Sequence, residues 1–255
     1  GSTNSSYHGA QVSFSRRFQN GLSYNTSYTF SKLLDYVSSL HIAGPAPILV
    51  SGEMDLAQNP FNLNAEHGPS LFDSRHRLTL STLYDLPGVP HGPRALRALV
   101  RNWQWSGIAT WNTGTPFTVY DSRNVSLQAA IPPVAGMFGS RPDLVQNPNA
   151  GSHSVEQWVN PAAFRRLDAV TEAGHFGNAG RNIVRGPGRF VLDSSLVRHL
   201  HLSEAASLQL RLEAFNATNH TNLGTPVNDM VSPNFGRIVE AGPARLFQVA
   251  AKFVF

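Results

Sequence analysis

The last nine residues of the chain, 247–255, alternate between apolar and more polar side chains. Gln248 and Lys252 belong to the polar set. The apolar set consists of Phe247, Val249, Ala251, Phe253 and Phe255. A period of two is that of a β-strand, because successive side chains of a strand point to opposite faces. A strand with one apolar face fits a membrane β-barrel, whose outer face meets lipid, or the edge of a soluble β-sandwich.

Six further segments show the same alternation, which predicts seven strands in all. In the third segment, for example, Leu78 and Leu80 alternate with Arg77 and Thr79. Most segments reach the roughly 9–11 residues that a tilted membrane-crossing strand needs. The predicted strands cover residues 7–18, 22–32, 76–86, 103–112, 190–202, 207–216 and 244–255.

The first two segments predict a β-hairpin. Gln19, Asn20 and Gly21 separate them, and we expect these residues to form a three-residue loop. Such a loop pairs Phe18 with Leu22 and matches the apolar faces of both strands. Gly21 is expected in the left-handed conformation that such loops favour.

The connections between the segments differ in length in a regular way. Residues 19–21, 87–101 and 203–206 form short or moderate connections. They alternate with long, Gly- and Pro-rich connections at residues 33–75, 113–189 and 217–243. Outer-membrane barrels have short periplasmic turns and long extracellular loops, whereas a sandwich has no reason to sort its loops.

The sequence therefore predicts an all-β fold, an antiparallel up-and-down transmembrane β-barrel in the bacterial outer membrane. Seven strands with periplasmic short turns place residue 1 outside the cell and Phe255 in the periplasm. A closed barrel has an even number of strands, so we expect residues 1–255 to be the C-terminal portion of a larger barrel. Aromatic residues support this orientation: Trp103, Trp105 and Tyr84 are expected near the inner rim, and Phe30 and Trp111 near the outer one.

Composition and motifs exclude several other classes of protein. The chain has no cysteine, which excludes disulfides and Cys-based zinc sites, and no run of about 18 apolar residues that predicts a membrane helix. A net charge of +4 with scattered arginines does not indicate nucleic-acid binding. No catalytic or phosphate-binding motif is present, so we expect neither an enzyme nor a cofactor. His199 and His201 have a spacing that suits a metal, but we favour a hydrated lumen face.

Several strings in the long connections resemble one family. With Ser6–His8 and Arg211–Asn216, they are similar to the C-terminal barrel of Oar-like TonB-dependent outer-membrane receptors of the carboxypeptidase-regulatory-like type, common in Acidobacteria. The strings are 59–63, 72–77, 158–164, 176–188 and 232–238. The resemblance implies a barrel of about 22 strands around a plug domain. It also implies energy-coupled nutrient uptake, with TonB and the barrel-assembly machinery as partners.

Candidate functional residues fall into three groups. We expect Asp193, Arg211 and Glu213 on the lumen face, where they would line a solute path or pair with one another. Asp73, Arg75 and Arg77 cluster at the outer end of the third strand, as loop-anchoring ion pairs or as ligand contacts. By resemblance, the five apolar residues of the tail would form the barrel-assembly signal. The expected partners are TonB, the assembly machinery, lipid and a small nutrient or oligomeric solute; the alternative function is a secreted or surface β-rich binding module.

Overall fold

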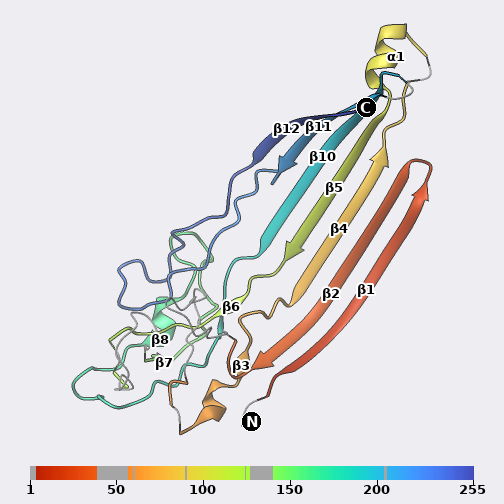
Figure 1. Cartoon of the computed structure of the whole chain (residues 1–255). Helices are drawn as coiled ribbons and strands as arrows, with labels where there is room; N and C mark the ends of the chain where they lie inside the picture. Colours follow the sequence, from red (N-terminus) through yellow and green to blue (C-terminus); the bar gives the residue numbers. More distant parts are fainter. Residues whose placement is uncertain are drawn as a thin grey trace.

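One antiparallel sheet dominates the molecule. The computed structural model describes residues 4–38, 57–59, 61–89, 91–123, 125–126, 140–203 and 206–255. Neighbouring strands follow the order β1-β2-β4-β5-β10-β11-β12 (Figure 1). Their bounds are β1 Ser6–Gln19, β2 Leu22–Asp35, β4 His76–Asp85, β5 Trp103–Asn112, β10 Arg189–His201, β11 Ser207–Phe215 and β12 Leu246–Val254. Each strand lies within three residues of its predicted range. The all-β, antiparallel, up-and-down architecture is confirmed.

The strands form a single layer with two open edges. β1 and β12 stand at the two ends of the order, and no pairing joins them within the described residues. A soluble sandwich would place a second sheet over Val249, Ala251 and Phe253. No such sheet covers them in the described part of the chain, and the side chain of Val249 is 79% exposed. The single layer argues against the sandwich.

The strand register places most of the apolar residues of the large strands on one face. Leu212 of β11 lies opposite both Leu196 of β10 and Val249 of β12. On the other half of the sheet, Leu80 lies opposite Ala109 of β5. Because side chains alternate with a period of two, this register carries one apolar face across the sheet and leaves a second face rich in Ser, Thr, Asn and charged residues. We call these the apolar face and the polar face.

The first hairpin differs from the prediction in its turn. Gln19 pairs with Leu22, so the loop has two residues, Asn20 at φ 53° and Gly21 at φ 79°. The predicted three-residue loop and the pairing of Phe18 with Leu22 are wrong, whereas the left-handed Gly21 is confirmed. An Asn-Gly turn with two positive φ angles matches the twist of the strands. A bulge between Arg16 and Gln19 takes up the extra residue.

The long connections contain the hydrophobic core of the molecule. Phe117, Val119, Ala163 and Val184 belong to one buried cluster, and none of them lies in the large strands. We call the described residues of 57–75, 113–188 and 217–243 the loop cap; they gather at one end of the sheet (Figure 1). The cap contains the short elements η1 Leu63–Glu66, β3 Gly68–Pro69, β6 Pro116–Phe117, β7 Asp143–Leu144, η2 Pro161–Ala163, β8 Phe164–Arg165 and β9 Val184–Arg185.

The opposite end of the sheet carries the short connections and one helix. Helix α1, Arg94–Val100, lies between β4 and β5, near the C-terminus in Figure 1. The sequence predicted only a connection here. Pro93 precedes the helix, in keeping with the preference of proline for helix starts.

Within the described residues, no helix has the length and the apolar character required to cross a membrane.

Candidate functional site

The hollows of the sheet lie on its polar face. One of about 410 Å³ is lined by polar residues such as Ser15, Asn25 and Ser81, together with the apolar residues Leu83 and Ile108. Another, of about 640 Å³, lies at the α1 end and is lined by Asp85, Gln104, His199 and His201, among others. Within the described residues, no group of three potential metal ligands occurs. The polar face is therefore the hollowed, water-accessible side of the wall.

A third hollow lies at the cap end of the polar face and has a basic lining. It has a volume of about 430 Å³ and is lined by Ser74, Arg77, Thr110, Asn112, Arg189 and Val191. Asn112 of β5 lies opposite Arg77 of β4 on one side and Arg189 of β10 on the other. Neighbouring strands are about 4.8 Å apart, so the two arginines are held about 10 Å apart across one amide. We call this site the basic hollow.

Within the described residues, no carboxylate forms an ion pair with the charges of the basic hollow, which are those of Arg77 and Arg189. Asp73, the closest carboxylate to Arg77 in sequence, pairs with Arg185 instead. Two unpaired guanidinium groups on one hollow surface attract anions, because their fields add.

Asp73 anchors the cap to the end of the sheet. Its side chain is 1% exposed, pairs with Arg185 and accepts a hydrogen bond of 2.8 Å from the backbone N–H of Leu33. Arg185 also donates to the carbonyl oxygen of Gly114 at 3.2 Å. Arg75 is half-buried, and its carbonyl accepts from the N–H of Ser31 at 3.0 Å. The predicted cluster of Asp73, Arg75 and Arg77 is therefore divided in the structure. Asp73 attaches the cap to the sheet, whereas Arg77 lines the basic hollow.

Two more buried arginines join the first and second long connections. Arg181 pairs with Asp35 at the end of β2 and donates to the carbonyl of Glu66 at 2.9 Å. Arg141 forms two hydrogen bonds of 2.8 Å with the carboxylate of Glu66. Because a buried charge is stable only when it is paired, these contacts hold both connections in one arrangement. Arg181 lies in the 176–188 string, but no local sequence pattern predicts that it pairs with Asp35.

The second and third long connections are joined mainly by backbone contacts. The N–H of Trp158 donates to the carbonyl of Gly236 at 2.8 Å, and the N–H of Met230 donates to the carbonyl of Tyr120 at 2.9 Å. The rings of Phe164 and Phe235 meet edge to face at 6.2 Å. The cap is therefore one packed unit built from all three connections.

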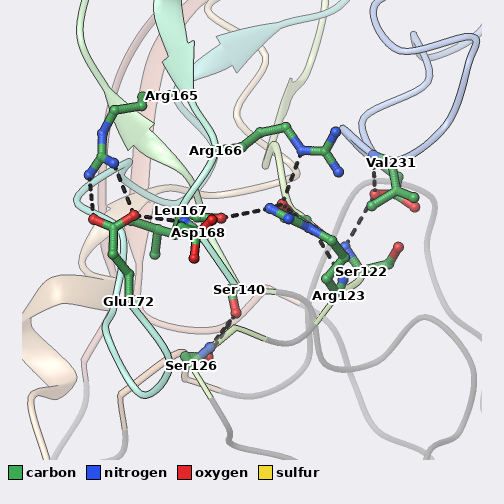
Figure 2. A network of polar contacts seen from close by, with 12 residues as sticks. Ser122, Arg123, Ser126, Ser140, Arg165, Arg166, Leu167, Asp168, Glu172 and Val231 are labelled. Carbon is green, nitrogen blue, oxygen red and sulfur yellow. Dashed lines mark hydrogen bonds and ion pairs between the residues drawn. The ribbon is translucent and has the colours of Figure 1, made fainter. Parts of the chain in front are cut away.

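The cap also contains a network of polar contacts between carboxylates and arginines, which includes Arg123, Arg165, Arg166 and Glu172 (Figure 2). Asp121 accepts hydrogen bonds from Arg123 at 2.9 Å and from Arg166 at 3.4 Å. Burial alone would raise the pKa of Asp121, but the hydrogen bonds and charge of Arg123 outweigh it and lower the pKa. The hydrogen bond from Arg165 lowers the pKa of Glu172 in the same way.

The predicted lumen charges lie on the polar face and are satisfied within the wall. Asp193 accepts a hydrogen bond of 2.9 Å from the N–H of Asn216, which secures the cap end of β10 and β11. Arg211 and Glu213 pair with each other at 3.4 Å. Their positions opposite Val197 and Ser195 place them on the polar face.

Aromatic residues gather at both ends of the apolar face. At the cap end, the His76 ring lies 5.1 Å from that of Phe30 and 6.5 Å from that of Trp111. At the α1 end, Tyr84 lies opposite Trp105 in the ladder. Phe247 and Phe253 continue the apolar face along β12, and Phe255 follows the strand with its ring 5.8 Å from that of Phe253.

A family model described as "Outer membrane beta barrel domain" matches residues 1–248, which include the basic hollow and the loop cap. No curated protein matches the chain.

Proposed function

Because the chain belongs to the family of outer membrane β-barrel domains, we propose that it forms the wall of a TonB-dependent receptor for nutrient uptake. The family places the chain in the bacterial outer membrane, so the apolar face meets lipid and the polar face lines the lumen. The resemblance of its loop strings to Oar-like receptors favours the TonB-dependent type. In this proposal, the long extracellular loops capture a scarce solute, and plug movement driven through TonB releases it inward.

The position of the basic hollow beneath the loop cap carries this proposal. Long loops are extracellular in such barrels, so the cap lies outside the cell. A solute that leaves the cap for the lumen would meet Arg77, Asn112 and Arg189, which line the wall just below it. A path that begins in a folded extracellular cap and continues along a charged lumen wall suits a receptor that transports its ligand.

The chemistry of the hollow favours a solute with anionic groups. Guanidinium groups bind carboxylates and phosphates in a planar, bidentate geometry. Rings of Arg or Lys have the same effect in anion-selective pores. The amide of Asn112 adds a neutral donor and acceptor between the two arginines.

The open edges of the sheet favour a larger barrel. β1 and β12 each present one row of backbone N–H and C=O groups without a strand partner in the described part of the chain. Unpaired edges of this kind are not tolerated in lipid. We therefore propose that further strands pair with both edges and that a plug fills the lumen. TonB would act through the plug side, and the barrel-assembly machinery would bind the final strand.

Binding measurements on the full-length protein test this function. The protein purified in detergent is expected to bind the C-terminal domain of TonB, and deletion of its TonB-contacting segment is expected to abolish binding. Failure of the full-length protein to bind TonB would overturn the TonB-dependent assignment.

A second measurement tests the ligand chemistry separately. Calorimetric titration with citrate and with inorganic phosphate is expected to show binding that Arg77→Ala/Arg189→Ala weakens several-fold. Arg17→Ala, in the polar-face hollow that is lined by β1, β2, β4 and β5, is the matched control. Equal binding by both variants would exclude the basic hollow as the anion site and leave the TonB result unaffected.

A further inference from the structure

Helix α1 is amphipathic and has no buried residue. Leu96 and Leu99 are 47% and 58% exposed. Residues three and four apart share a face of a helix, so Leu96, Leu99 and Val100 lie on one side. Arg94 and Arg97 lie on the opposite side, as in helices that rest on a membrane surface.

Two side chains from the wall hold the end of this helix. The indole N–H of Trp103 donates to the carbonyl of Leu99 at 2.8 Å, and the guanidinium of Arg198 donates to the carbonyl of Ala98 at 2.5 Å. Arg198 also lies over the Trp103 ring, 5.4 Å from its centre. The last carbonyls of a helix lack partners within it and attract cations, so both contacts stabilise the helix end.

Both anchoring residues belong to the apolar face of the wall. Arg198 and Trp103 lie opposite each other in the ladder, and Arg198 also lies opposite Leu210 of the apolar face. The helix is therefore attached to the lipid-facing side of the wall rather than to its lumen side. It lies at the end opposite the loop cap, which is the periplasmic end (Figure 1).

We propose that α1 is a membrane-surface helix that lies in the periplasmic leaflet of the outer membrane. Leu96 and Leu99 enter the boundary between headgroups and acyl chains, and Arg94 and Arg97 contact the phosphates of anionic phospholipids. Two observations select lipid as the occupant. The helix with its exposed leucines is held by two residues of the lipid-facing side of the wall, and the charges opposite the leucines complement an anionic headgroup layer.

Spin labels at four positions test this proposal. Residues 1–255 contain no cysteine, so single-cysteine variants at Arg94, Leu96, Arg97 and Leu99 each carry one label in this part of the protein. Any cysteine elsewhere in the full-length protein is replaced by serine. The full-length protein is reconstituted in vesicles of phosphatidylethanolamine and phosphatidylglycerol. A high rate of collision between the label and oxygen indicates that the label lies in hydrocarbon. A high rate of collision with a water-soluble nickel chelate indicates that it lies in water. Labels at Val249 and Gln248 serve as lipid-facing and lumen-facing references.

The proposal predicts a periodic result. The ratio of oxygen to nickel accessibility is expected to be several-fold higher at Leu96 and Leu99 than at Arg94 and Arg97, and close to the Val249 reference. Arg94→Gln/Arg97→Gln is expected to lower the ratio at Leu96, as does replacement of phosphatidylglycerol by phosphatidylcholine. Equal, water-like ratios at all four positions would overturn the proposal. Shielding of Leu96 and Leu99 from both reagents would also overturn it, because it would indicate a protein partner.

Discussion

The guanidinium of Arg141 and the carboxylate of Glu66 meet through two hydrogen bonds of 2.8 Å although 75 residues separate them. The two side chains are only 4% and 5% exposed. Glu66 also accepts from the backbone N–H of Gln58 at 3.0 Å. The first and second long connections therefore share a buried charge pair, and the cap depends on both partners being present.

Removal of one partner is expected to open the cap but not the wall. Arg141→Met leaves the Glu66 carboxylate buried and unpaired, which costs about 3–5 kcal/mol. Hydrogen exchange should become much faster at Val119 and Val184 of the cap core and stay unchanged in β4 and β5. Arg141→Met/Glu66→Met is expected to be less destabilising than Arg141→Met alone. Arg165→Met, which removes the two more exposed pairs with Asp143 and Glu172, is the control. Unchanged exchange in the Arg141 variant would contradict this role.

Acid is expected to loosen the cap through Asp121. Its pKa in the folded protein is lowered, because hydrogen bonds from Arg123 outweigh the effect of burial. A lowered carboxyl pKa stabilises the fold above the pKa of the unfolded chain, about 4, and this contribution is lost as the pH falls through the folded value. Cap stability should thus be level from pH 7 to about 5 and decline below about 4.

Asp121→Asn is the variant that tests this pH dependence. The variant should lower the stability of the cap at pH 7 and should reduce the loss of stability below about pH 4. Hydrogen exchange at Leu167 and Asp168 measures both effects. The lowered pKa values of Asp168 and Glu172 leave part of the decline in place. An identical pH profile for the variant and the original protein would show that Asp121 contributes nothing.

The hydroxyl of Ser194 on the apolar face should contribute more to stability than the hydroxyl of Ser195 on the polar face. The indole N–H of Trp105 donates to the hydroxyl of Ser194 at 2.8 Å, on the face that meets lipid. Ser194→Ala leaves this donor without a partner in hydrocarbon, which costs about 1–3 kcal/mol. Ser195→Ala, on the hydrated polar face, is expected to be nearly neutral. The free energy of unfolding from lipid bilayers is measured for both variants. Equal losses of stability would argue against lipid contact at Trp105.

The strand faces could be predicted from the sequence because they depend only on a local period of two. Neighbouring strands must align their apolar faces. The face on which Leu80 or Val249 lies could therefore be predicted without knowledge of the register. The hairpin turn was missed because a bulge after Arg16 changes the loop length without changing the pattern of the strand. Arg77 was named as a candidate. Arg189 was missed because the predicted strand began one residue later.

The packing of the cap and the presence of helix α1 could not be predicted from the period of two. The contact of Arg181 with Asp35 spans 146 residues, and no periodic pattern links such distant partners. Helix α1 has a signal in Pro93 and in the spacing of Leu96 and Leu99. Its seven residues are fewer than an isolated helix needs, and the bonds from Trp103 and Arg198 stabilise its end.

The most direct test of a lipid-covered apolar face compares two neighbouring residues of β12. Val249 lies opposite Leu212 on the apolar face, and Gln248 lies opposite Glu213 on the polar face. In the full-length protein refolded into lipid bilayers, Val249→Arg should lower the free energy of unfolding by about 2–4 kcal/mol. Gln248→Arg, which places a cation beside Glu213, should have little effect. Equal losses, or a larger loss for Gln248→Arg, would contradict the assignment of the lipid-facing side.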